Sequence, residues 1–328
     1  MINGVSVVIP NYNGAVLLPQ VLPTVEKALQ KVGLPSEIIV VDDCSTDDTV
    51  KVLRDNFPSV IVLRNEINSG FSLTSNKGVR AAKFNWVLLL NSDVKLEEGY
   101  FAPLLKYAER PAVFGVMGRI IGWDDEEIQD GAKYPYFHGV KIKTSGNYLL
   151  KDPAQMKEGL LSMYLSGANA FFNRSVFLEL NGFNEMFSPF YVEDFELSLR
   201  AWRLGYSSYY EHAAVCRHKT SITIVSGNRK KYIRKIYNRN KMFLHAIHLQ
   251  QPMRMLWFLQ LLLESIGQLI SLKFSYLASV ALFVKNHKGV KRSRQQLGEV
   301  AGSRELLSVS EVVEKINQFI KGKDTIRF

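Results

Sequence analysis

The sequence predicts an α/β fold, in which a mixed, mainly parallel sheet of Rossmann-like type is flanked by helices and followed by a C-terminal helical extension. Short apolar runs alternate with helical patterns over the first half of the chain, which is typical of successive βαβ units. Acidic residues follow three apolar or aromatic stretches, in "IIVVDDCSTDDT", "WVLLLNSDV" and "FYVEDFELSLR". Because an open α/β sheet holds its ligand at the carboxyl ends of its strands, these acids predict a ligand crevice there.

The expected strands are short runs rich in Val, Ile and Leu, as in strands that are buried on both faces. They cover residues 5–9, 37–41, 60–63, 86–90 and 113–117. Helices are expected at residues 17–32, 72–83, 173–180 and 193–205. A further helix is expected directly after residue 47, with Ser45, Thr46 and Asp47 as its N-cap candidates. One or two further strands are expected between residues 206 and 221.

Between residues 119 and 160 the periodicity fades into a polar, aromatic and glycine-containing stretch. Long irregular stretches inside compact domains are usually functional or mobile. This stretch is therefore interpreted as a lid or an acceptor-side loop, with an ordinary β-ribbon excursion as the alternative.

The composition is that of a globular protein with a substantial core, because 47% of the 328 residues are hydrophobic and 22% are charged. Cys44 and Cys216 are too few for a disulfide framework, which fits a reducing compartment. No basic segment followed by an apolar one opens the chain, so we expect no secretory signal peptide.

The formal net charge of +10 is concentrated in the C-terminal part of the chain. Residues 228–294 hold fourteen Lys or Arg and one acid, Glu264, which leaves 27 basic and 30 acidic residues elsewhere. A basic block beside apolar helices favours an anionic membrane surface as the partner over a nucleic acid. The alternative is an ordinary solvated helix face.

Residues 255–284 are strongly apolar, but polar side chains recur at steps of three and four on one helix face, unlike a uniform transmembrane span. The polar positions are Gln260, Glu264, Gln268, Ser271, Ser275 and Ser279. The pattern predicts an in-plane interfacial helix or hairpin. A helix buried between the N-terminal part and its neighbours, or a dimer seam, is the alternative. The expected domains are residues 1–225, an amphipathic extension at 226–294, and a tail helix in 295–328.

Two strand ends supply candidates for binding a planar base and a ribose. Pro10 and Tyr12 end the first expected strand, where an aromatic ring can stack on a base. Asp43 ends the second, where a carboxylate can accept a hydrogen bond from a base N–H or a ribose hydroxyl. Ordinary turn chemistry and capping of the next helix are the alternatives.

Asn91, Ser92 and Asp93 follow the fourth expected strand and offer one carboxylate and two neutral oxygens. A divalent cation bound together with a diphosphate needs few protein ligands, because phosphates and waters complete its shell. The stretch is therefore a lean candidate metal site, with a strand-end turn as the alternative. His218 is a candidate further ligand or phosphate contact, although a lone histidine is more often structural.

Glu193 and Asp194 are the candidates for a general base. The N-terminus of a helix favours the ionised form of a carboxyl group. The preceding stretch "FSPFYVED" is aromatic and apolar and would wall a pocket. Simple compensation of the helix dipole is the alternative.

Six stretches together resemble the inverting family-2 glycosyltransferases of GT-A fold, over roughly residues 3–222. They are "VSVVIPNYNG", "IIVVDDCSTDDT", "NSGFSLTSNKGV", "WVLLLNSDV", "SGANAFFNRSVFLELNGFNE" and "YVEDFELSLRAWRLGY". The last two, with the NSD form of the metal motif, look most like bacterial rhamnosyltransferases that act on surface polysaccharides. Asn91 departs from the usual Asp-X-Asp motif, which weakens the expectation of absolute metal dependence.

The resemblance implies inverting transfer of a sugar from a UDP- or dTDP-linked donor to an acceptor hydroxyl, with Mn²⁺ or Mg²⁺ as cofactor. The acceptor would be a lipid-linked or surface polysaccharide precursor, and the enzyme would be peripheral to the cytoplasmic face of the membrane. A homodimer is left open. Two other functions also remain: a sugar nucleotidyltransferase, although no glycine-rich phosphate loop opens the chain, and a non-catalytic, membrane-associated binding protein of the same fold.

The resemblance also implies a role for each matching residue. The base and ribose would be held by Pro10, Tyr12 and Asp43, and the nucleotide or phosphate side would be lined by Asn76 and Lys77, with Asn91 and Ser92 beside the diphosphate. The metal would be bound by Asp93 and His218, and the sugar and acceptor pocket would be shaped by Gly167, Ala168 and Asn169. The base would be Asp194, with Glu193 beside it.

Overall fold

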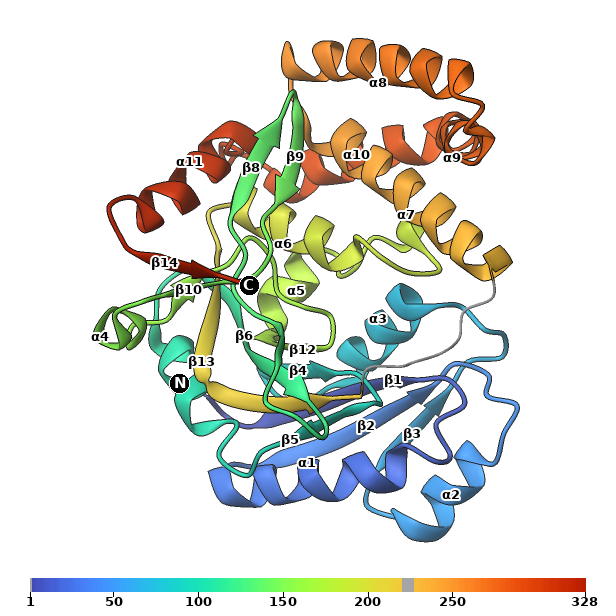
Figure 1. The fold of residues 1–328 in the computed structure, drawn as a ribbon. Helices are drawn as coiled ribbons and strands as arrows, with labels where there is room; N and C mark the ends of the chain where they lie inside the picture. Colours follow the sequence, from blue (N-terminus) through green and yellow to red (C-terminus); the bar gives the residue numbers. More distant parts are fainter. Residues whose placement is uncertain (1, 220–226) are drawn as a thin grey trace.

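A ten-stranded mixed sheet forms the centre of the N-terminal part, with helices on both faces (Figure 1). The computed structural model describes residues 2–219 and 227–328. The strand order is β11-β13-β6-β12-β4-β1-β2-β3, with β5 paired to β13 and β7 paired to β6. These strands are β1 (Val5–Asn11), β2 (Ser36–Asp42), β3 (Ile61–Arg64), β4 (Trp86–Leu90), β5 (Val94–Leu96), β6 (Val113–Gly122), β7 (Ile128–Asp130), β11 (Leu160–Leu161), β12 (Asn169–Asn173) and β13 (Ser207–His218). The predicted α/β fold is confirmed.

Helices cover the two faces of the sheet and form the C-terminal part. They are α1 (Leu18–Val32), α2 (Thr49–Asn56), α3 (Phe71–Ala81), α4 (Pro153–Met156), α5 (Arg174–Glu179), α6 (Glu193–Arg203), α7 (Gly227–His248), α8 (Met253–Ile270), α9 (Phe274–Lys285), α10 (His287–Ala301) and α11 (Val309–Ile320), with short 3₁₀ helices at Ala102–Glu109 and Glu185–Phe187. The N-cap of α2 is Asp48 and not one of the three predicted residues, although Oδ1 of Asp47 accepts a hydrogen bond from the backbone N–H of Thr49, the first residue of α2. Ser45 and Asp47 instead accept hydrogen bonds from Asn13 and Ala15 in the loop before α1.

The apolar runs form strands because both faces of the sheet are covered. Val7 and Ile9 of β1 pack with α1 in one core, whereas Val8 packs with α3, α5 and α6 in a second core on the other face. A third core joins α6 to α7, α8, α9, α10 and α11, and contains Trp202 and Trp257. The division expected at residue 225 stays a prediction, although this third core crosses it.

One edge of the sheet collects most of the predicted site residues. Strands β1, β2, β3 and β4 are parallel and therefore end at the same edge. Strand β12 is antiparallel to β4 and pairs Asn169 with Leu90, so it starts where β4 ends. Strand β13 runs parallel to β6 and reaches the same edge at His218. Residues far apart in the sequence are thus brought to one line of strand ends.

The stretch at residues 119–160 is a β-ribbon excursion, the alternative given for it above. It contains the end of β6, β7, the hairpin of β8 (Pro135–His138) and β9 (Lys141–Thr144), and β10 (Tyr148–Leu150), which pairs with β14 (Thr325–Arg327). The β8–β9 hairpin rises from the sheet towards α8 (Figure 1). At its tip, the backbone N–H of Val140 donates to Oε1 of Gln260 in α8 at 3.1 Å.

The apolar segment expected at residues 255–284 forms the hairpin of α8 and α9. The polar face of α8 is turned inwards, since Gln260 bonds the β8–β9 hairpin and Glu264 pairs with Lys141 of β9. Within the described residues, we find no helix with both the length and the apolar character needed to cross a membrane.

Candidate active site

A cavity of about 420 Å³ lies at the edge of the sheet where the strands end. Its wall combines strand ends, the segment before β12, the loop before α6, and the start of α3. Six of the predicted site residues line it: Asn91, Gly167, Ala168, Glu193, Asp194 and His218. The structure therefore brings the predicted base and part of the predicted diphosphate side into one cavity.

Asp194 is held at the N-terminus of α6 by backbone donors. Its Oδ1 accepts from its neighbour Phe195 at 2.7 Å, and its Oδ2 lies 3.4 Å from the backbone nitrogen of Gly167. Burial raises the pKa of Asp194, whereas these two N–H groups and the charge of Lys133 act in the opposite direction. The ionised form thus has specific partners although the residue is buried.

Glu193 differs from Asp194 in its surroundings. Its Oε2 is buried and has no hydrogen-bond partner in the described part of the chain. Burial, together with the charge of Asp194, raises the pKa of Glu193 to about 8. Two adjacent buried carboxyl groups do not both ionise readily, so the pair favours holding one proton, and the backbone donors at Asp194 favour Glu193 as the group that keeps it.

The loop before α6 has an unusual backbone that a C-terminal helix supports. Tyr191 and Val192 have φ angles of 73° and 75°, which non-glycine residues rarely adopt. The side-chain Nδ2 of Asn240, in α7, lies 2.6, 3.0 and 2.8 Å from the carbonyl oxygens of Phe187, Phe190 and Tyr191. Asn240 is fully buried, and the sequence analysis missed it because no local pattern marks the helix face that meets this loop.

Asp93 and His218 are the predicted metal ligands, and their side chains face each other. Nε2 of His218 is 3.5 Å from Oδ2 of Asp93, and Nδ1 of His218 is 2.9 Å from Oε1 of Gln129. Oδ1 of Asp93 is buried and lacks a partner among the described residues. A hydrogen-bonded imidazole and a carboxylate with a free oxygen fit a divalent cation. No larger cluster of three or more His, Cys, Asp or Glu ligands occurs in the described residues.

Trp123 fixes the position of the Asp93 backbone and was not predicted. Its indole Nε1 donates to the carbonyl oxygens of Asp93 at 3.0 Å and Arg217 at 2.9 Å. The amine groups of Lys95 and Lys219 lie 3.7 and 5.0 Å from the centre of its ring system. Trp123 thereby ties the end of β4 to the end of β13.

Asp43 lies at the same edge but does not line the cavity. Its carboxylate accepts from Nδ2 of Asn65 and from the backbone N–H groups of Ser69 and Gly70, each at 2.8 Å. Gly70 has a φ of 83°, and a Cβ there would come within about 3 Å of the backbone of Pro189. Asp43 therefore holds the loop before α3, whose first residue is part of the cavity wall, and does not cap α2.

The remaining predicted residues take different positions. Tyr12 is 50% exposed at the end of β1, beside the half-buried Pro10. Ser92 is half-buried beside Asp93. Nζ of Lys77 donates to the carbonyl oxygen of Arg64 at 2.6 Å. None of these four lines the cavity.

Asn76 and Asn169 require a correction. Asn76 is buried in α3, where its amide bonds both the backbone N–H and the carbonyl oxygen of Phe183. Asn169 is fully buried and donates to the carbonyl oxygen of Gly118 at 3.0 Å and to Sγ of Cys216. Asn76 was predicted on the nucleotide or phosphate side and Asn169 in the sugar and acceptor pocket, but both side chains are bound within the core and neither lines the cavity.

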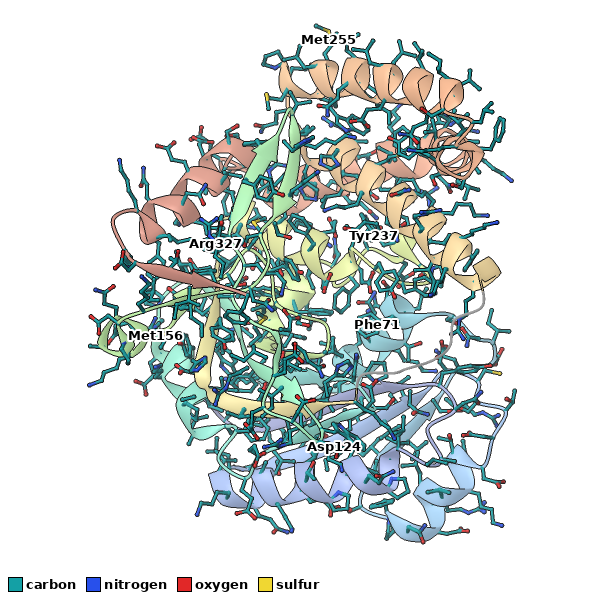
Figure 2. All side chains as sticks on the ribbon, viewed as in Figure 1. Phe71, Asp124, Met156, Tyr237, Met255 and Arg327 are labelled. Atoms are coloured by element: carbon teal, nitrogen blue, oxygen red, sulfur yellow. The ribbon has the colours of Figure 1, made fainter. Side chains whose placement is uncertain are left out.

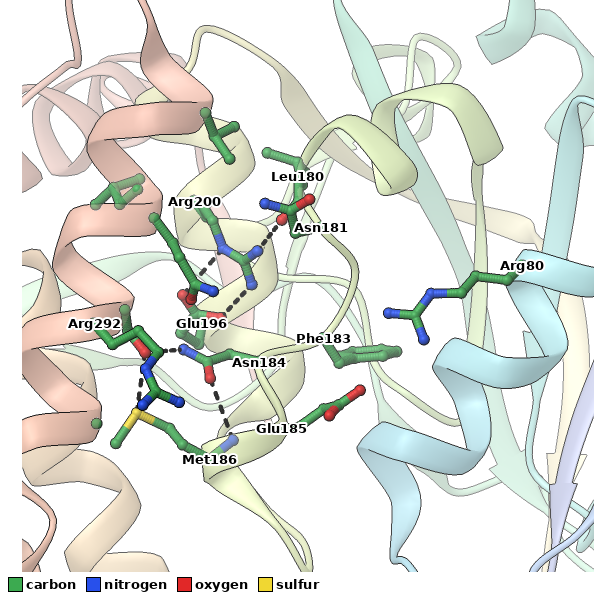
Figure 3. A pocket seen from close by; sticks show the side chains of 15 residues that line it. Arg80, Leu180, Asn181, Phe183, Asn184, Glu185, Met186, Glu196, Arg200 and Arg292 are labelled. Carbon is green, nitrogen blue, oxygen red and sulfur yellow. Dashed lines mark hydrogen bonds and ion pairs between the residues drawn. The ribbon is translucent and has the colours of Figure 1, made fainter. Parts of the chain in front are cut away.

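A second cavity, of about 360 Å³, lies between α10 and the α5–α6 region and shares no residue with the first (Figure 3). In its wall Arg200 pairs with Glu196 and donates to the carbonyl oxygen of Leu180. His248 of α7 lies 3.0 Å from Oε1 of Glu196. Burial opposes ionisation of Glu196, but Arg200 and His248 lower its pKa to about 2. This network anchors α6, and hence Asp194, to the C-terminal helices.

The comparison with known proteins agrees with this geometry. A family model described as "Glycosyl transferase family 2" matches residues 6–180. The O-antigen chain rhamnosyltransferase RfbN of Salmonella typhimurium is 27% identical over 224 residues, which are 67% of this chain and 67% of that protein. The N-acetylglucosaminyl-diphospho-decaprenol L-rhamnosyltransferase of Mycobacterium tuberculosis is 26% identical over 231 residues, which are 61% of this chain and 74% of that protein.

Two solved structures share the fold. GalNAc-T7 with UDP, GalNAc and Mn²⁺ superposes with a TM-score of 0.69 at 17% identity, over 97% of this chain and 57% of that chain. The mannosyltransferase PcManGT from Pyrobaculum calidifontis superposes with a TM-score of 0.52 at 16% identity, over 97% of this chain and 80% of that chain.

The fold is the GT-A fold that these two structures share. Because the family model covers more than half of the sequence, the chain belongs to glycosyl transferase family 2, with rhamnosyltransferases among its relatives. The predicted family and enzyme class are confirmed. This result favours a glycosyltransferase over the nucleotidyltransferase and non-catalytic alternatives.

Proposed function

We propose that the chain transfers a hexose from a nucleoside diphosphate donor to an acceptor hydroxyl, with inversion, in the cavity that Asp194 lines. One observation carries the proposal. Glu193 and Asp194 face the cavity from the N-terminus of α6, while Asn91 and His218 face it from the ends of β4 and β13. A buried base and the polar ends of two strands therefore line one space that can hold a sugar.

Asp194 is the general base in this reaction. It accepts the proton of the acceptor hydroxyl as that oxygen bonds to the anomeric carbon, and the bond from this carbon to the diphosphate breaks with its electrons moving to the nucleotide. Glu193 keeps its proton at neutral pH, since its pKa of about 8 favours the acid form. A single displacement inverts the anomeric centre and needs no covalent intermediate.

The strand ends of β1 and β2 are the proposed donor side. Pro10 and Tyr12 would contact the base, and Asp43 would act with the loop it holds, for a UDP- or dTDP-linked sugar. Rhamnose is the first candidate sugar, because two relatives are named as rhamnosyltransferases.

Asp93 and His218 are the residues that would hold Mn²⁺ or Mg²⁺. Their fit rests on the unpartnered Oδ1 of Asp93 and on the imidazole held by Gln129. A bound cation would neutralise charge on the leaving diphosphate. Asn91 supplies an amide where a second carboxylate would strengthen the site, so we propose assistance by the metal at modest affinity.

The outer face of α8 supports attachment to a membrane surface. Its exposed side chains are Met255, Leu256, Phe258, Leu259, Leu262, Leu263, Ile266, Leu269 and Ile270. Met255 lies on the outer side of this helix (Figure 2). A continuous apolar face of this size on a basic segment is typical of an interfacial helix. We place the enzyme at the cytoplasmic face of the membrane, acting on a lipid-linked or surface polysaccharide precursor.

A donor screen tests the proposal. Purified full-length protein is mixed with UDP- and dTDP-linked sugars, with and without Mn²⁺, and thermal stabilisation and donor hydrolysis are measured. We expect one nucleotide class to stabilise the protein and to be hydrolysed slowly, more so with Mn²⁺. Absence of stabilisation and of hydrolysis across the whole panel would contradict the proposed donor class.

A further inference from the structure

We propose that a cavity lined by three lysines, next to the active site, binds the diphosphate group of a lipid-linked sugar acceptor. This inference rests on the proposed function, because it names the acceptor class for that reaction. The cavity has a volume of about 350 Å³ and lies between β9, α7, α8 and α9. Among the residues that line it are Lys141, Lys143, Lys241, Tyr237, Trp257 and Tyr276.

The charge of this cavity suits a diphosphate. Lys141 is neutralised by Glu264, which also accepts a hydrogen bond from Tyr276 at 3.0 Å. Lys143 and Lys241 form no ion pair with a carboxylate in the residues described, so the cavity has an excess of two positive charges. Charge-assisted hydrogen bonds to phosphate oxygens are among the stronger polar contacts in proteins.

The charged form of Lys241 is disfavoured by burial, and a bound anion would stabilise it. Burial, and next the charge of Lys143, lower the pKa of Lys241 to about 8, whereas the charge of Asp194 acts in the opposite direction. Its Nζ lies 4.8 Å from the ring centre of Phe195. A bound phosphate would restore the favourable environment that the charged amine lacks.

Two tyrosines that contact each other line the active-site cavity and the basic cavity, respectively. Tyr191 lines the active-site cavity and also an adjoining cavity of about 440 Å³, which Tyr237 lines as well. Tyr237 then lines the basic cavity, and the two rings are 6.3 Å apart. In Figure 2, Tyr237 lies between Phe71, at the active site, and the α8 helix. A sugar at Asp194 could therefore carry a diphosphate at the lysines.

The helices that line the basic cavity also have apolar faces that a lipid chain can contact. Helices α8 and α9 close it on the side away from Asp194, and the outer faces of both are apolar, as Leu263 and Phe274 illustrate with 61% and 61% exposure. Trp257, in its wall, has a buried indole N–H without an acceptor in the described residues. Asp194, the lysines of the basic cavity and the apolar faces of α8 and α9 thus correspond, in this order, to the sugar, the diphosphate and the lipid of such an acceptor.

Farnesyl diphosphate, with farnesol as the uncharged counterpart, tests this order. Binding to the full-length protein is measured by fluorescence quenching without divalent cations. We expect farnesyl diphosphate to bind at least about tenfold more tightly than farnesol, and Lys143→Gln and Lys241→Gln each to weaken it by about tenfold. Lys288→Gln, at an exposed lysine of α10 outside the cavity, should leave the affinity unchanged.

Three outcomes would overturn the inference. First, farnesol could bind as tightly as farnesyl diphosphate. Second, Asp93→Asn could abolish binding of farnesyl diphosphate, which would place this probe at the metal site. Third, the lysine variants could lose affinity only for phosphatidylglycerol vesicles, which would assign the cavity to a bilayer headgroup. Donor stabilisation is measured on the same preparation. A protein that binds a nucleotide-sugar but not farnesyl diphosphate refutes this inference alone, whereas a protein that binds neither contradicts the proposed function.

Discussion

The side-chain nitrogen of Asn240 lies 2.8 Å from the carbonyl oxygen of Tyr191, and this contact joins a C-terminal helix to the loop that ends at the proposed general base. Tyr191 and Val192 both have positive φ angles, which require support from the surrounding structure. Asn240 supplies that support through three carbonyl groups of one loop. The C-terminal helices therefore complete the active site as well as extend the chain.

Replacing Asn240 tests whether this support positions the base. Asn240→Ala leaves three carbonyl groups without their donor, which should lower the unfolding free energy by about 1–3 kcal/mol. We also expect kcat to fall at least about tenfold, with little change in the donor KM, because misplacing a reacting group slows the chemical step. Kinetics well below the melting temperature and urea denaturation measure the two effects. Gln295→Ala, whose side chain bonds only Glu299 on the exposed face of α10, is the control and should be neutral. A variant with normal kcat would show that the loop keeps its conformation without Asn240.

The raised pKa of Glu193 predicts a pH-dependent stability. The folded protein keeps a proton up to a pH of about 8 that the unfolded chain releases near 4.5. The stabilisation from this group is therefore complete below pH 4.5 and is lost as the pH rises through 8. Glu193→Gln mimics the protonated form, so it should match the wild type at low pH and be more stable at alkaline pH, by up to about 5 kcal/mol. Denaturation curves between pH 5 and 9 measure this difference, and a difference that stays constant over that range would contradict the assignment.

The proposed metal ligands, Asp93 and His218, predict a specific change in cation dependence. Asp93→Ala and His218→Ala should raise the Mn²⁺ concentration for half-maximal activity by at least about tenfold, because each removes a ligand from a lean site. Trp123→Phe should cause a smaller rise, since it removes only the N–H that holds the Asp93 backbone. Asp124→Asn, at an exposed acid near this edge, serves as the matched control. If all four variants, including the control, required the same Mn²⁺ concentration, Asp93 and His218 would not be metal ligands.

The exposed apolar face of α8 predicts binding to vesicles. Leu262→Glu and Leu263→Glu together place two charges on side chains that are 58% and 61% exposed, so the fold should keep its melting temperature. Sedimentation with phosphatidylglycerol vesicles should fall at least about tenfold, because both charges would enter the membrane interface. Ile61→Glu, at a 43% exposed residue of β3, should bind vesicles normally. If the double variant instead dissociates a dimer, as light scattering would show, and still binds vesicles, α8 is a contact between copies.

The sheet and half of the site could be predicted from the sequence, because both depend on local patterns. Buried parallel strands are continuous apolar runs, and their carboxyl ends meet at one edge, so Asp43, Asp93 and Asp194 were expected around one crevice. Asp194 lines the cavity, but Asp43 and Asp93 are not among its lining residues. The roles of Asn240, Trp123 and Lys241 could not be predicted in this way. Each depends on which helix or loop packs against a distant segment, and a residue type on one helix face does not specify its partner.

Two errors came from assigning a role by position in a motif. Asn76 and Asn169 stand in stretches that resemble the family, yet their amides bond the backbone of the core. Polar side chains in such stretches serve either the ligand or the buried backbone, and burial decides between them. The sequence shows the residue type but not the direction of its side chain.

The most direct test of the account is the effect of Asp194→Asn on sugar transfer and on nucleotide binding in the same preparation. The amide keeps the size of the side chain and cannot take the proton of an acceptor hydroxyl. We expect transfer to fall by at least about a thousandfold, within the range that general base catalysis contributes, while the nucleotide dissociation constant changes less than about twofold. Transfer at the wild-type rate, with the nucleotide still bound, would show that another group removes the proton.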